Sequence, residues 1–396
     1  MKPGIVQKIF KDHFESYRKT RVLGRRQYHA AGSIMSCRTS KQGYHINACP
    51  NGDYEVLMHN SCKHRSCPLC GCTETQLWLE RRKRQALDCR YFHVTITISH
   101  DLHPLWRHNR KVFTNLMMRG AWHSLRELLQ DVKWLGALPG AVAVFQSWDD
   151  EMKDHCHIHM IVTAGGLNKD NRWINVKKDQ LVYTPVLASK FKGKFLAYMK
   201  EALNPLTSKG EVKPEKDRLY PPPGISIQKC RNLLNRLGLK RWHANIEEPY
   251  EHANGVFKYV GRYIRRGSIS ERRIIDYDKD TVRIVYAHKE KHEDRDFTVS
   301  AQTFVDRFLS HVPAKGSHLV RSFGLFHPNC RKRLDIARNE LGQQPYEPIT
   351  DLPNTQELLK QMYPDKDVNV CPHCGSELKT VLVYRHGRSP TWRLAA

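Results

Sequence analysis

The amino-acid sequence predicts an α+β protein. Its core is expected to be a mainly antiparallel sheet with inserted helices, covered on one face, and a small N-terminal domain is expected to precede it. Two observations predict the sheet: β-rich segments with alternating apolar and polar residues recur through the middle of the chain, and stretches with helical periodicity separate them. A third observation, the crowding of cysteines near the N-terminus, predicts the small domain.

The elements of the predicted sheet follow one another along the chain. Strands are expected at 91–99, 140–148, 155–163 and 240–248, a hairpin at 273–288, and helices at 109–131, 187–203 and 255–267. Because only a polar turn separates the second strand from the third, these two are expected to form an antiparallel hairpin. The stretch 204–224 is rich in Pro, Gly and charge, which predicts a loop or an insertion.

Three regions are expected from this pattern. Residues 1–88 hold the cysteine cluster and end in a basic helical run, residues 89–315 hold the predicted sheet, and residues 316–396 form a polar, basic tail with two late cysteines. No internal repeat is visible.

The charge balance indicates a polyanionic partner. Lysine and arginine number 65 against 40 acidic residues, which leaves a net charge of +25, and such an excess most often indicates nucleic acid. The N-terminus lacks the apolar segment of a signal peptide, and no apolar run approaches membrane-spanning length. We therefore expect a cytoplasmic protein with no membrane partner.

Three histidines alternate in the stretch HCHIHMI. Successive side chains of a strand point to opposite faces, so His155, His157 and His159 are expected to share one face. Neutral imidazole is a common ligand of divalent metals, and the apolar run that follows would hold such ligands rigidly. The alternative is a set of hydrogen-bonded strand histidines, which a single histidine would favour but three in alternation do not.

A third metal ligand is expected on or near the preceding strand. Gln146 would lie beside the histidines in a hairpin, and the acidic turn offers three alternatives, Asp149, Asp150 and Glu151. An oxygen ligand would suit a hard ion such as Mg2+ or Mn2+, whereas three histidines alone would suit zinc.

Two tyrosines lie four residues apart in the predicted helix 255–267. Tyr259 and Tyr263 fall on its apolar stripe, and four cations flank them: Lys258, Arg262, Arg265 and Arg266. Periodicity alone favours two core aromatics. Beside a metal site and a basic excess, the tyrosines also fit phosphoryl transfer, because nearby positive charge can activate a phenol whose pKa is ordinarily about 10.

The clustering of the N-terminal cysteines predicts ligands of a structural zinc (Zn2+) rather than disulfides, because thiols stay reduced in the cytosol. Four ligands are expected among Cys37, Cys49, Cys62, Cys67 and Cys70. The choice of the fourth ligand stays open and also includes His59 and His64. A zinc site would stabilise a domain too small to fold alone and present Lys63 and Arg65 to DNA; a chance cluster of buried thiols is the alternative.

The late CPHC motif supplies Cys371 and Cys374, half of a second zinc site. His327 and Cys330 have HxxC spacing and could form the other half. A loose tail with unpaired thiols is the competing interpretation.

Together, these motifs resemble a known family. The His-hydrophobe-His strand followed by a YxxxY helix resembles the HUH endonucleases with two tyrosines. NSCKHRSCPLC, SAQTFVDRFLSHVPAKG and CPHCG extend the likeness to the rolling-circle transposases typified by insertion sequence ninety-one. The resemblance covers roughly residues 30–330 and the tail. The chain departs from the family at Gly52, where many members have a second cysteine.

The resemblance implies an HUH-type catalytic core. His157 and His159 would be metal ligands with Gln146 as the third, and Tyr259 and Tyr263 would be the nucleophiles. It implies cleavage and transfer of single-stranded DNA at transposon ends and into target DNA, through 5′-phosphotyrosine intermediates, by a cytoplasmic, nucleoid-associated protein of bacterial type. Rival interpretations are an HUH replication initiator or relaxase, a metallohydrolase that uses water, and a non-catalytic zinc-dependent DNA-binding protein.

Overall fold

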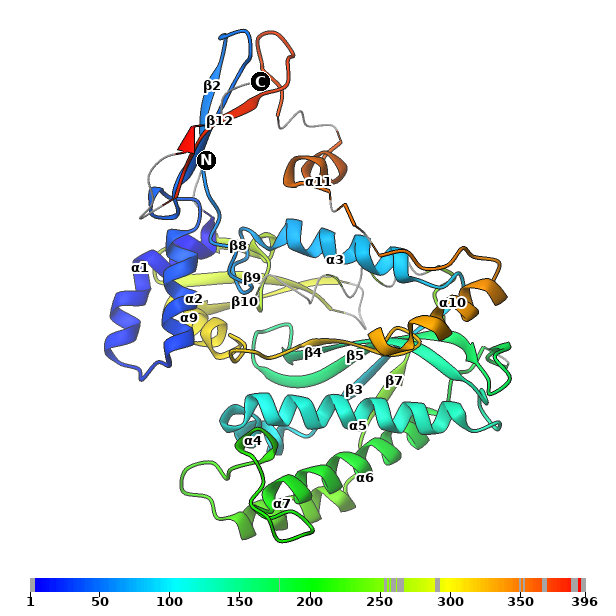
Figure 1. Cartoon of the computed structure of the whole chain (residues 1–396). Coiled ribbons are helices and arrows are strands. Elements are labelled where there is room, and N and C mark those ends of the chain that lie inside the picture. Colours follow the sequence, from blue (N-terminus) through cyan, green and yellow to red (C-terminus); the bar gives the residue numbers. More distant parts are fainter. Residues whose placement is uncertain are drawn as a thin grey trace.

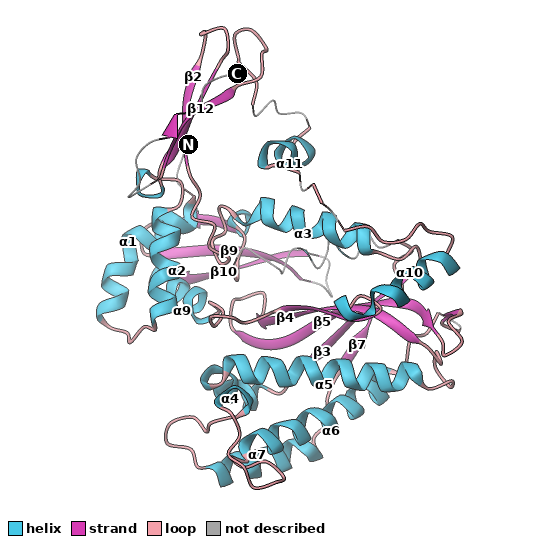
Figure 2. Cartoon of the chain, in the orientation of Figure 1, coloured by secondary structure: helices cyan, strands magenta, loops and turns pink. Residues whose placement is uncertain are grey.

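The computed structural model of the chain describes residues 4–177, 179–252, 255, 257, 261, 267–288, 293–348, 350–351, 353–364, 369–385 and 391–392. A central sheet lies between helices on both sides, a second body with its own sheet adjoins one end, and a narrow ribbon of strands projects away from both (Figure 1). Figure 2 shows helices and strands mixed through the whole chain. The predicted α+β class is confirmed, because every strand pairing described is antiparallel.

The central sheet has the strand order β11-β4-β5-β3-β7, and β6 pairs with β5. Its strands are β3 (Tyr91–Thr97), β4 (Leu138–Trp148), β5 (Asp154–Leu167), β6 (Trp173–Asn175), β7 (Ala244–Ile246) and β11 (Val320–Gly324). The predicted hairpin is the β4–β5 pair at its centre. The strand expected at 240–248 shortens to β7, because the Trp242 indole donates to the Leu237 carbonyl and holds the preceding residues against a helix end.

One face of this sheet packs on a helical layer. The layer contains η2 (His100–Leu102), α4 (His103–His108), α5 (Arg110–Gln130), α6 (Thr184–Leu203) and α7 (Ile227–Leu239). Phe145 and Met160 point from the sheet into the largest apolar core, which α5 and α6 close with Phe113, Phe191 and Phe195. The connection 204–224 is a loop apart from the short η3 (Glu215–Asp217). None of the described helices is both long and apolar enough to cross a membrane.

The opposite face of the sheet is also covered. Here α3 (Gly71–Gln85), η5 (Pro328–Cys330) and α10 (Arg331–Glu340) lie over the strands (Figure 1), and Val144 and Ile161 pack with Leu79 and Leu334. The expectation of a sheet covered on one face was therefore wrong. Both faces of β5 are buried, since from Cys156 to Leu167 no residue of the strand is exposed.

A second body combines the start of the chain with residues from its second half. It contains α1 (Ile5–Lys19), α2 (Arg25–Ser36), η4 (Glu271–Arg273), β8 (Ile274–Tyr277), β9 (Thr281–His288), β10 (Glu293–Ser300) and α9 (Ala301–Ser310). Phe10, Ile34, Ile284 and Phe308 share its core. The carboxylate of Glu271 accepts bonds from the first amides of α1, at Ile5 (2.7 Å) and Val6 (3.2 Å). The predicted boundary at residue 88 does not separate two cores, because these segments fold together.

The projecting ribbon joins the two ends of the chain, and we call it the terminal ribbon. It contains β1 (Tyr44–Ala48), β2 (Glu55–His59), β12 (Lys379–Tyr384) and β13 (Thr391–Trp392) in the order β13-β12-β1-β2. In the sequence, the short η1 (Ser40–Gln42) precedes β1, and α11 (Thr355–Met362) follows α10 and precedes β12. Residues 316–396 are therefore not a separate tail: β11 extends the central sheet and β12 pairs with β1.

Candidate functional site

The predicted metal ligands meet on the sheet face that α3 covers. His157 on β5 lies directly opposite Gln146 on β4, and the Nε2 atoms of His157 and His159 are 3.0 Å apart. His157, His159 and Gln146 are all buried. His155, on the same face, is half-buried, and its ring centroid lies 4.9 Å from that of His157.

The hydrogen bonds of His157 determine which of its nitrogens carries the proton. Its Nδ1 lies 2.8 Å from the carbonyl oxygen of His155. Because a carbonyl can only accept, Nδ1 must donate, and in the neutral ring Nε2 then keeps its lone pair. The backbone of one predicted histidine thus orients the side chain of the next.

A relay of three side chains does the same for His159. The Nδ1 of His159 lies 2.9 Å from the Nε2 of His93 on β3, and the Nδ1 of His93 lies 2.9 Å from the carboxylate of Glu247, just after β7. A carboxylate there favours the proton on Nδ1 of His93, so that His93 accepts from His159. His159 therefore also keeps a lone pair on Nε2, the nitrogen that lies 3.0 Å from Nε2 of His157.

This geometry suits a divalent cation. Imidazole nitrogens bind a metal at about 2.0–2.1 Å, so two of them at a right angle lie about 3 Å apart, close to the observed 3.0 Å. Gln146 donates its Nε2 to the carbonyl of Trp148 at 2.9 Å, and its buried Oε1 has no hydrogen-bond partner among the described residues. A buried amide oxygen without a partner is costly, and a cation held by the two histidines would relieve that cost.

The three acidic alternatives are engaged in the turn or lie outside the sheet register. The Asp149 carboxylate accepts from the backbone amides of Glu151 (2.9 Å) and Lys153 (2.8 Å), and the Glu151 carboxylate pairs with the Lys153 ammonium. Among the predicted oxygen ligands, the strand register therefore places Gln146 beside His157. The register also shifts between Gln146 and Trp148, and such irregularities redirect side chains near functional sites.

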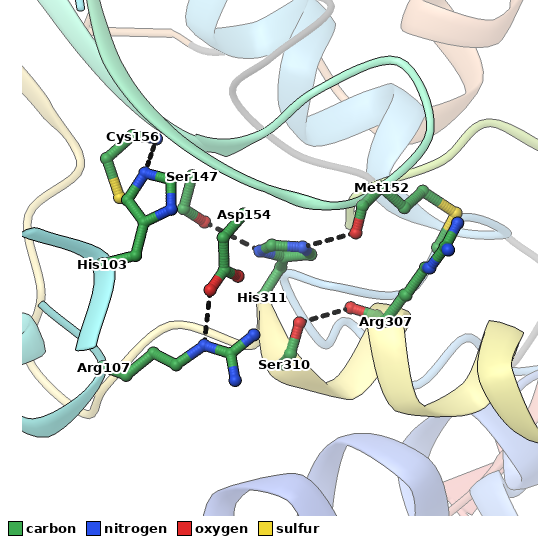
Figure 3. A network of polar contacts seen from close by, with 9 residues as sticks. All are labelled: His103, Arg107, Ser147, Met152, Asp154, Cys156, Arg307, Ser310 and His311. Atoms are coloured by element: carbon green, nitrogen blue, oxygen red, sulfur yellow. Dashed lines mark hydrogen bonds and ion pairs between the residues drawn. The ribbon is translucent and has the colours of Figure 1, made fainter. Parts of the chain in front are cut away.

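A buried polar network fixes the β4–β5 turn next to these ligands (Figure 3). His311, at the end of α9, accepts from the Ser147 hydroxyl at 3.1 Å and donates to the Met152 carbonyl at 2.9 Å. Arg107 pairs with Asp154 at the first residue of β5. The segment SAQTFVDRFLSHVPAKG, which contributed to the family resemblance, thus connects the second body to the histidine hairpin.

The predicted tyrosine helix begins on the same sheet face. Phe257 is buried, and its ring centroid lies 5.8 Å from Tyr91 of β3 and 6.3 Å from Trp78 of α3. A Cβ on Gly261 would lie 3.2 Å from Leu79 of α3. The remaining predicted residues of this segment lie outside the described residues: Tyr259, Tyr263, Lys258, Arg262, Arg265 and Arg266.

Four of the five predicted N-terminal cysteines form one cluster. Cys37, Cys62, Cys67 and Cys70 bring their sulfur atoms within 4.8 Å of one another, and the sulfurs of Cys62 and Cys70 are 3.6 Å apart. Hydrogen bonds from the Cys62, Cys67 and Cys70 thiols lower the pKa of Cys37. Four thiolates at this spacing are the ligand set of a structural zinc, so Cys37 completes the site.

The three basic residues between Cys62 and Ser66 differ in burial and in their contacts. His64 accepts a hydrogen bond from the Ser66 amide at 3.2 Å, and burial lowers the pKa of His64 to about 4. Lys63 is exposed with a left-handed backbone (φ 52°). Arg65 is half-buried and donates to the Ser317 carbonyl at 3.1 Å. The zinc loop therefore contacts the connection that precedes β11, and of the two predicted DNA contacts Lys63 is the more accessible.

The structure separates the predicted halves of the second zinc site. Cys371 and Cys374 lie with Cys49 and Asp53 in the terminal ribbon, within 4.8 Å of one another. His327 and Cys330 lie at η5 beside α10, where His327 accepts from the Asn329 amide at 3.2 Å. Strand pairing carries the late cysteines to β1, so the predicted pairing with His327 and Cys330 was wrong, and Cys49 belongs to this group.

Sequence reasoning missed His93 and Glu247. A signal was present, since His93, Thr95 and Thr97 alternate through the predicted strand 91–99 and must share one face. The sequence did not indicate which strands would lie beside this one. Only the sheet order places β3 beside β5 and β7 beside β3.

Comparisons with known proteins agree with these features. A family model described as "Transposase zinc-binding domain" matches residues 9–98, which include the cysteine cluster. A model described as "Putative transposase" matches residues 140–333, which include the histidine hairpin and the predicted tyrosine helix. The matched models indicate a transposase, an enzyme class that cleaves DNA and transfers strands.

Two related proteins extend the likeness over nearly the whole chain. "Putative transposase y4qJ" from Sinorhizobium fredii (strain NBRC 101917 / NGR234) is 29% identical over 377 residues, which cover 93% of this chain and 92% of that protein. "Transposase for insertion sequence element IS801" from Pseudomonas savastanoi pv. phaseolicola is 25% identical over 342 residues, which cover 84% of this chain and 73% of that protein. Together, the two models and the two relatives support an IS91-family rolling-circle transposase.

Proposed function

We propose that this transposase cuts and rejoins single-stranded DNA at the ends of its insertion sequence by a metal-dependent, tyrosine-based phosphodiester transfer. One observation carries the proposal: the Nε2 atoms of His157 and His159 lie 3.0 Å apart, and Gln146, directly opposite His157, has a buried Oε1 with no hydrogen-bond partner among the described residues. Two nitrogens and one oxygen, with further positions left for a phosphate, form a ligand set that Mn2+ or Mg2+ can use.

A cation held there would polarise the scissile phosphate and offset its developing negative charge. The protein residues hold the site in place: Glu247 and His93 fix the orientation of His159, and the His155 carbonyl fixes that of His157. Because these side chains are largely buried between the sheet and α3, little reorganisation is needed when DNA arrives.

Tyr259 and Tyr263 are the proposed nucleophiles. In the first step a phenolic oxygen forms a bond to phosphorus, the bond from phosphorus to the 3′-oxygen breaks, and the phenolic proton ends on the released 3′-hydroxyl. The 5′-phosphotyrosine keeps the energy of the phosphodiester, so a 3′-hydroxyl of another strand can reverse the reaction without ATP. Two tyrosines would allow both ends of the element to be held covalently.

The basic residues are proposed to hold the DNA. Lys258, Arg262, Arg265 and Arg266 neighbour the tyrosines in the sequence, and Lys63 is exposed at the zinc loop. Cations of this kind bind the phosphate backbone without reading its sequence. We infer that the protein acts in the bacterial cytoplasm, on nucleoid DNA.

The test uses labelled single-stranded DNA that carries an end of the insertion sequence, incubated with Mn2+ or Mg2+ and resolved by denaturing electrophoresis. We expect a covalent protein–DNA adduct from the wild type and none from the double variant Tyr259→Phe, Tyr263→Phe. Tyr183→Phe, a change at an exposed tyrosine, is the matched control and should form the adduct normally.

Other outcomes would reject the mechanism. Cleavage that persists in the double variant without an adduct would indicate attack by water. Tight binding of the end sequence with no cleavage by any protein would indicate a DNA-binding role. His157→Ala should also lose the adduct while its zinc content stays unchanged, which separates loss of the catalytic metal from loss of the zinc domain.

A further inference from the structure

The two ends of the chain meet at a second group of metal-binding side chains. Cys49 follows β1, Cys371 and Cys374 precede β12, and the sulfurs of Cys49 and Cys374 lie 3.3 Å apart although 325 residues separate them in the sequence. An Asp53 carboxylate oxygen lies 3.9 Å from the Cys49 sulfur. All four ligand atoms lie within 4.8 Å of one another.

The two turns that present these ligands share one backbone hydrogen bond. The amide of Cys49 donates to the carbonyl of Tyr54 at 2.8 Å, and the amide of Cys371 donates to the carbonyl of Ser376 at 2.8 Å, five residues further on in both cases. Each turn begins Cys-Pro. Two such turns facing each other at the ends of paired strands are the usual way in which a small β ribbon surrounds one zinc ion.

Counting from the first cysteine of each turn shows where the two turns differ in sequence. Gly52 then corresponds to Cys374, and Asp53 corresponds to Gly375. The first turn thus lacks its second cysteine. The left-handed residue, which favours glycine, is Gly52 (φ 78°) in the first turn and Gly375 (φ 75°), one position later, in the second. Asp53 is the adjacent residue, and its carboxylate provides an oxygen of a type that zinc accepts at about 2.0–2.2 Å.

We propose that Cys49, Cys371, Cys374 and Asp53 bind a second Zn2+ that fastens the C-terminal strands to the N-terminal domain. This site is separate from the cluster of Cys37, Cys62, Cys67 and Cys70, and the proposal does not rest on the proposed DNA chemistry. It assigns a partner to the late CPHC motif and a ligand role to Cys49.

The small apolar core of the terminal ribbon favours a metal over a chance meeting of thiols. Among the described residues of the ribbon, Cys49, Cys371 and Leu378 form one small buried cluster, with Tyr54 and Val56 half-buried against them, and Leu382 of β12 is buried outside it. A core of this size cannot offset the conformational entropy of ordering the strands, and proteins of this kind need a metal or a disulfide. The Asn51 amide also donates to the Cys374 sulfur at 3.5 Å, a contact that stabilises a metal-bound thiolate.

The first measurement is the zinc content of the purified full-length protein, kept under mild reducing conditions. Two groups of ligands predict about two zinc ions per chain. The substitution Cys374→Ser removes an exposed ligand and should lower the zinc content to about one ion per chain. Cys330→Ser is the matched control, a cysteine in the same half of the chain that belongs to neither group, and should keep about two.

Hydrogen exchange shows which part of the protein becomes less stable when the second zinc is lost. In Cys374→Ser the amides of β1, β2 and β12 should exchange faster, whereas those of β4 and β5 should not change. Asp53→Ala, a milder change at an exposed residue, should keep the second zinc but release it to a chelator at least about tenfold faster. This variant tests the site even if Cys374→Ser does not fold.

Several results would overturn the proposal. One zinc per wild-type chain, or an unchanged zinc content in a folded Cys374→Ser, would exclude a second site. Loss of zinc in Cys330→Ser would restore the pairing with His327. Two thiols missing from the wild type in a thiol titration and recovered on adding reductant, with Cys49 titrating in Cys374→Ser without reductant, would indicate a disulfide between Cys49 and Cys374. An unchanged release rate in Asp53→Ala would remove Asp53 from the ligand set.

Discussion

His93 links the carboxylate of Glu247 to His159. The Nδ1 of His93 lies 2.9 Å from the Glu247 carboxylate, and its Nε2 lies 2.9 Å from the Nδ1 of His159. The three residues come from the region after β7, from β3 and from β5, which the sheet order makes neighbours. A carboxylate and a histidine behind a ligand raise its basicity and fix its orientation. We therefore predict that His93 and Glu247, which do not bind the metal themselves, control the affinity of the site for the metal.

Replacing Glu247 should weaken metal binding. Glu247→Gln removes the charge that holds the proton on His93, and we expect the affinity for Mn2+ to fall about 10–100-fold. The measurement is a Mn2+ titration followed by electron paramagnetic resonance of the free ion. Glu248→Gln removes the same charge from the next, exposed residue and should bind as the wild type does; an equal loss in both variants would refute the relay.

Substitutions at Gln146 test the third ligand directly. Gln146→Glu places an anionic oxygen where the Oε1 has no described hydrogen-bond partner, so Mn2+ should bind more tightly. Gln146→Leu has a similar volume and no oxygen, and its affinity should fall roughly tenfold or more. If Gln146→Leu binds Mn2+ like the wild type, the third ligand lies elsewhere, and the acidic turn would be the next place to test.

His311 should make the stability of the fold depend on pH. Burial lowers the pKa of His311 to about 4, below the unfolded value of about 6.5. Between these values the unfolded chain binds the extra proton, so stability falls as the pH drops from about 6.5 toward 4, by about 2 kcal/mol at pH 5.

The comparison is between the wild type and His311→Gln, which can keep the hydrogen bonds but cannot titrate. The variant should be less stable at pH 7, and its unfolding temperature should fall less than that of the wild type between pH 7 and pH 5. Parallel pH curves for the two proteins would show that His311 does not contribute.

Two glycines should respond in opposite ways to alanine. A Cβ on Gly166 of β5 would lie 2.4 Å from the Leu138 carbonyl oxygen, so Gly166→Ala must move backbone and should destabilise the protein by about 1–3 kcal/mol. Gly193 is exposed in the middle of α6, and a Cβ there meets nothing within 4 Å. Gly193→Ala should stabilise the protein by about 0.5–1 kcal/mol. Chemical denaturation of both variants checks the pair; equal effects would show that the close approach at Gly166 is absent.

Local patterns predicted the elements better than they predicted their partners. The β4–β5 hairpin follows from two β-rich runs separated by a polar turn, and Gln146 lies opposite His157 as expected. The second body was not predicted, because α1 and α9 are amphipathic helices whose apolar faces only indicate that each needs a partner. For the same reason the sequence did not indicate that α1 packs with residues 271–310, or that β12 pairs with β1.

The sequence by itself determined that His157 and His159 share a strand face, and that Cys67 and Cys70 could bind one metal. Both conclusions depend on residues a few positions apart, whose relative placement the backbone geometry dictates. The tertiary structure alone decided that His93 supports His159 across 66 residues and that Cys49 meets Cys374 across 325. Those contacts arise from strand pairing between distant segments, and the periodicity of a strand indicates which face is buried but not which strand will lie beside it.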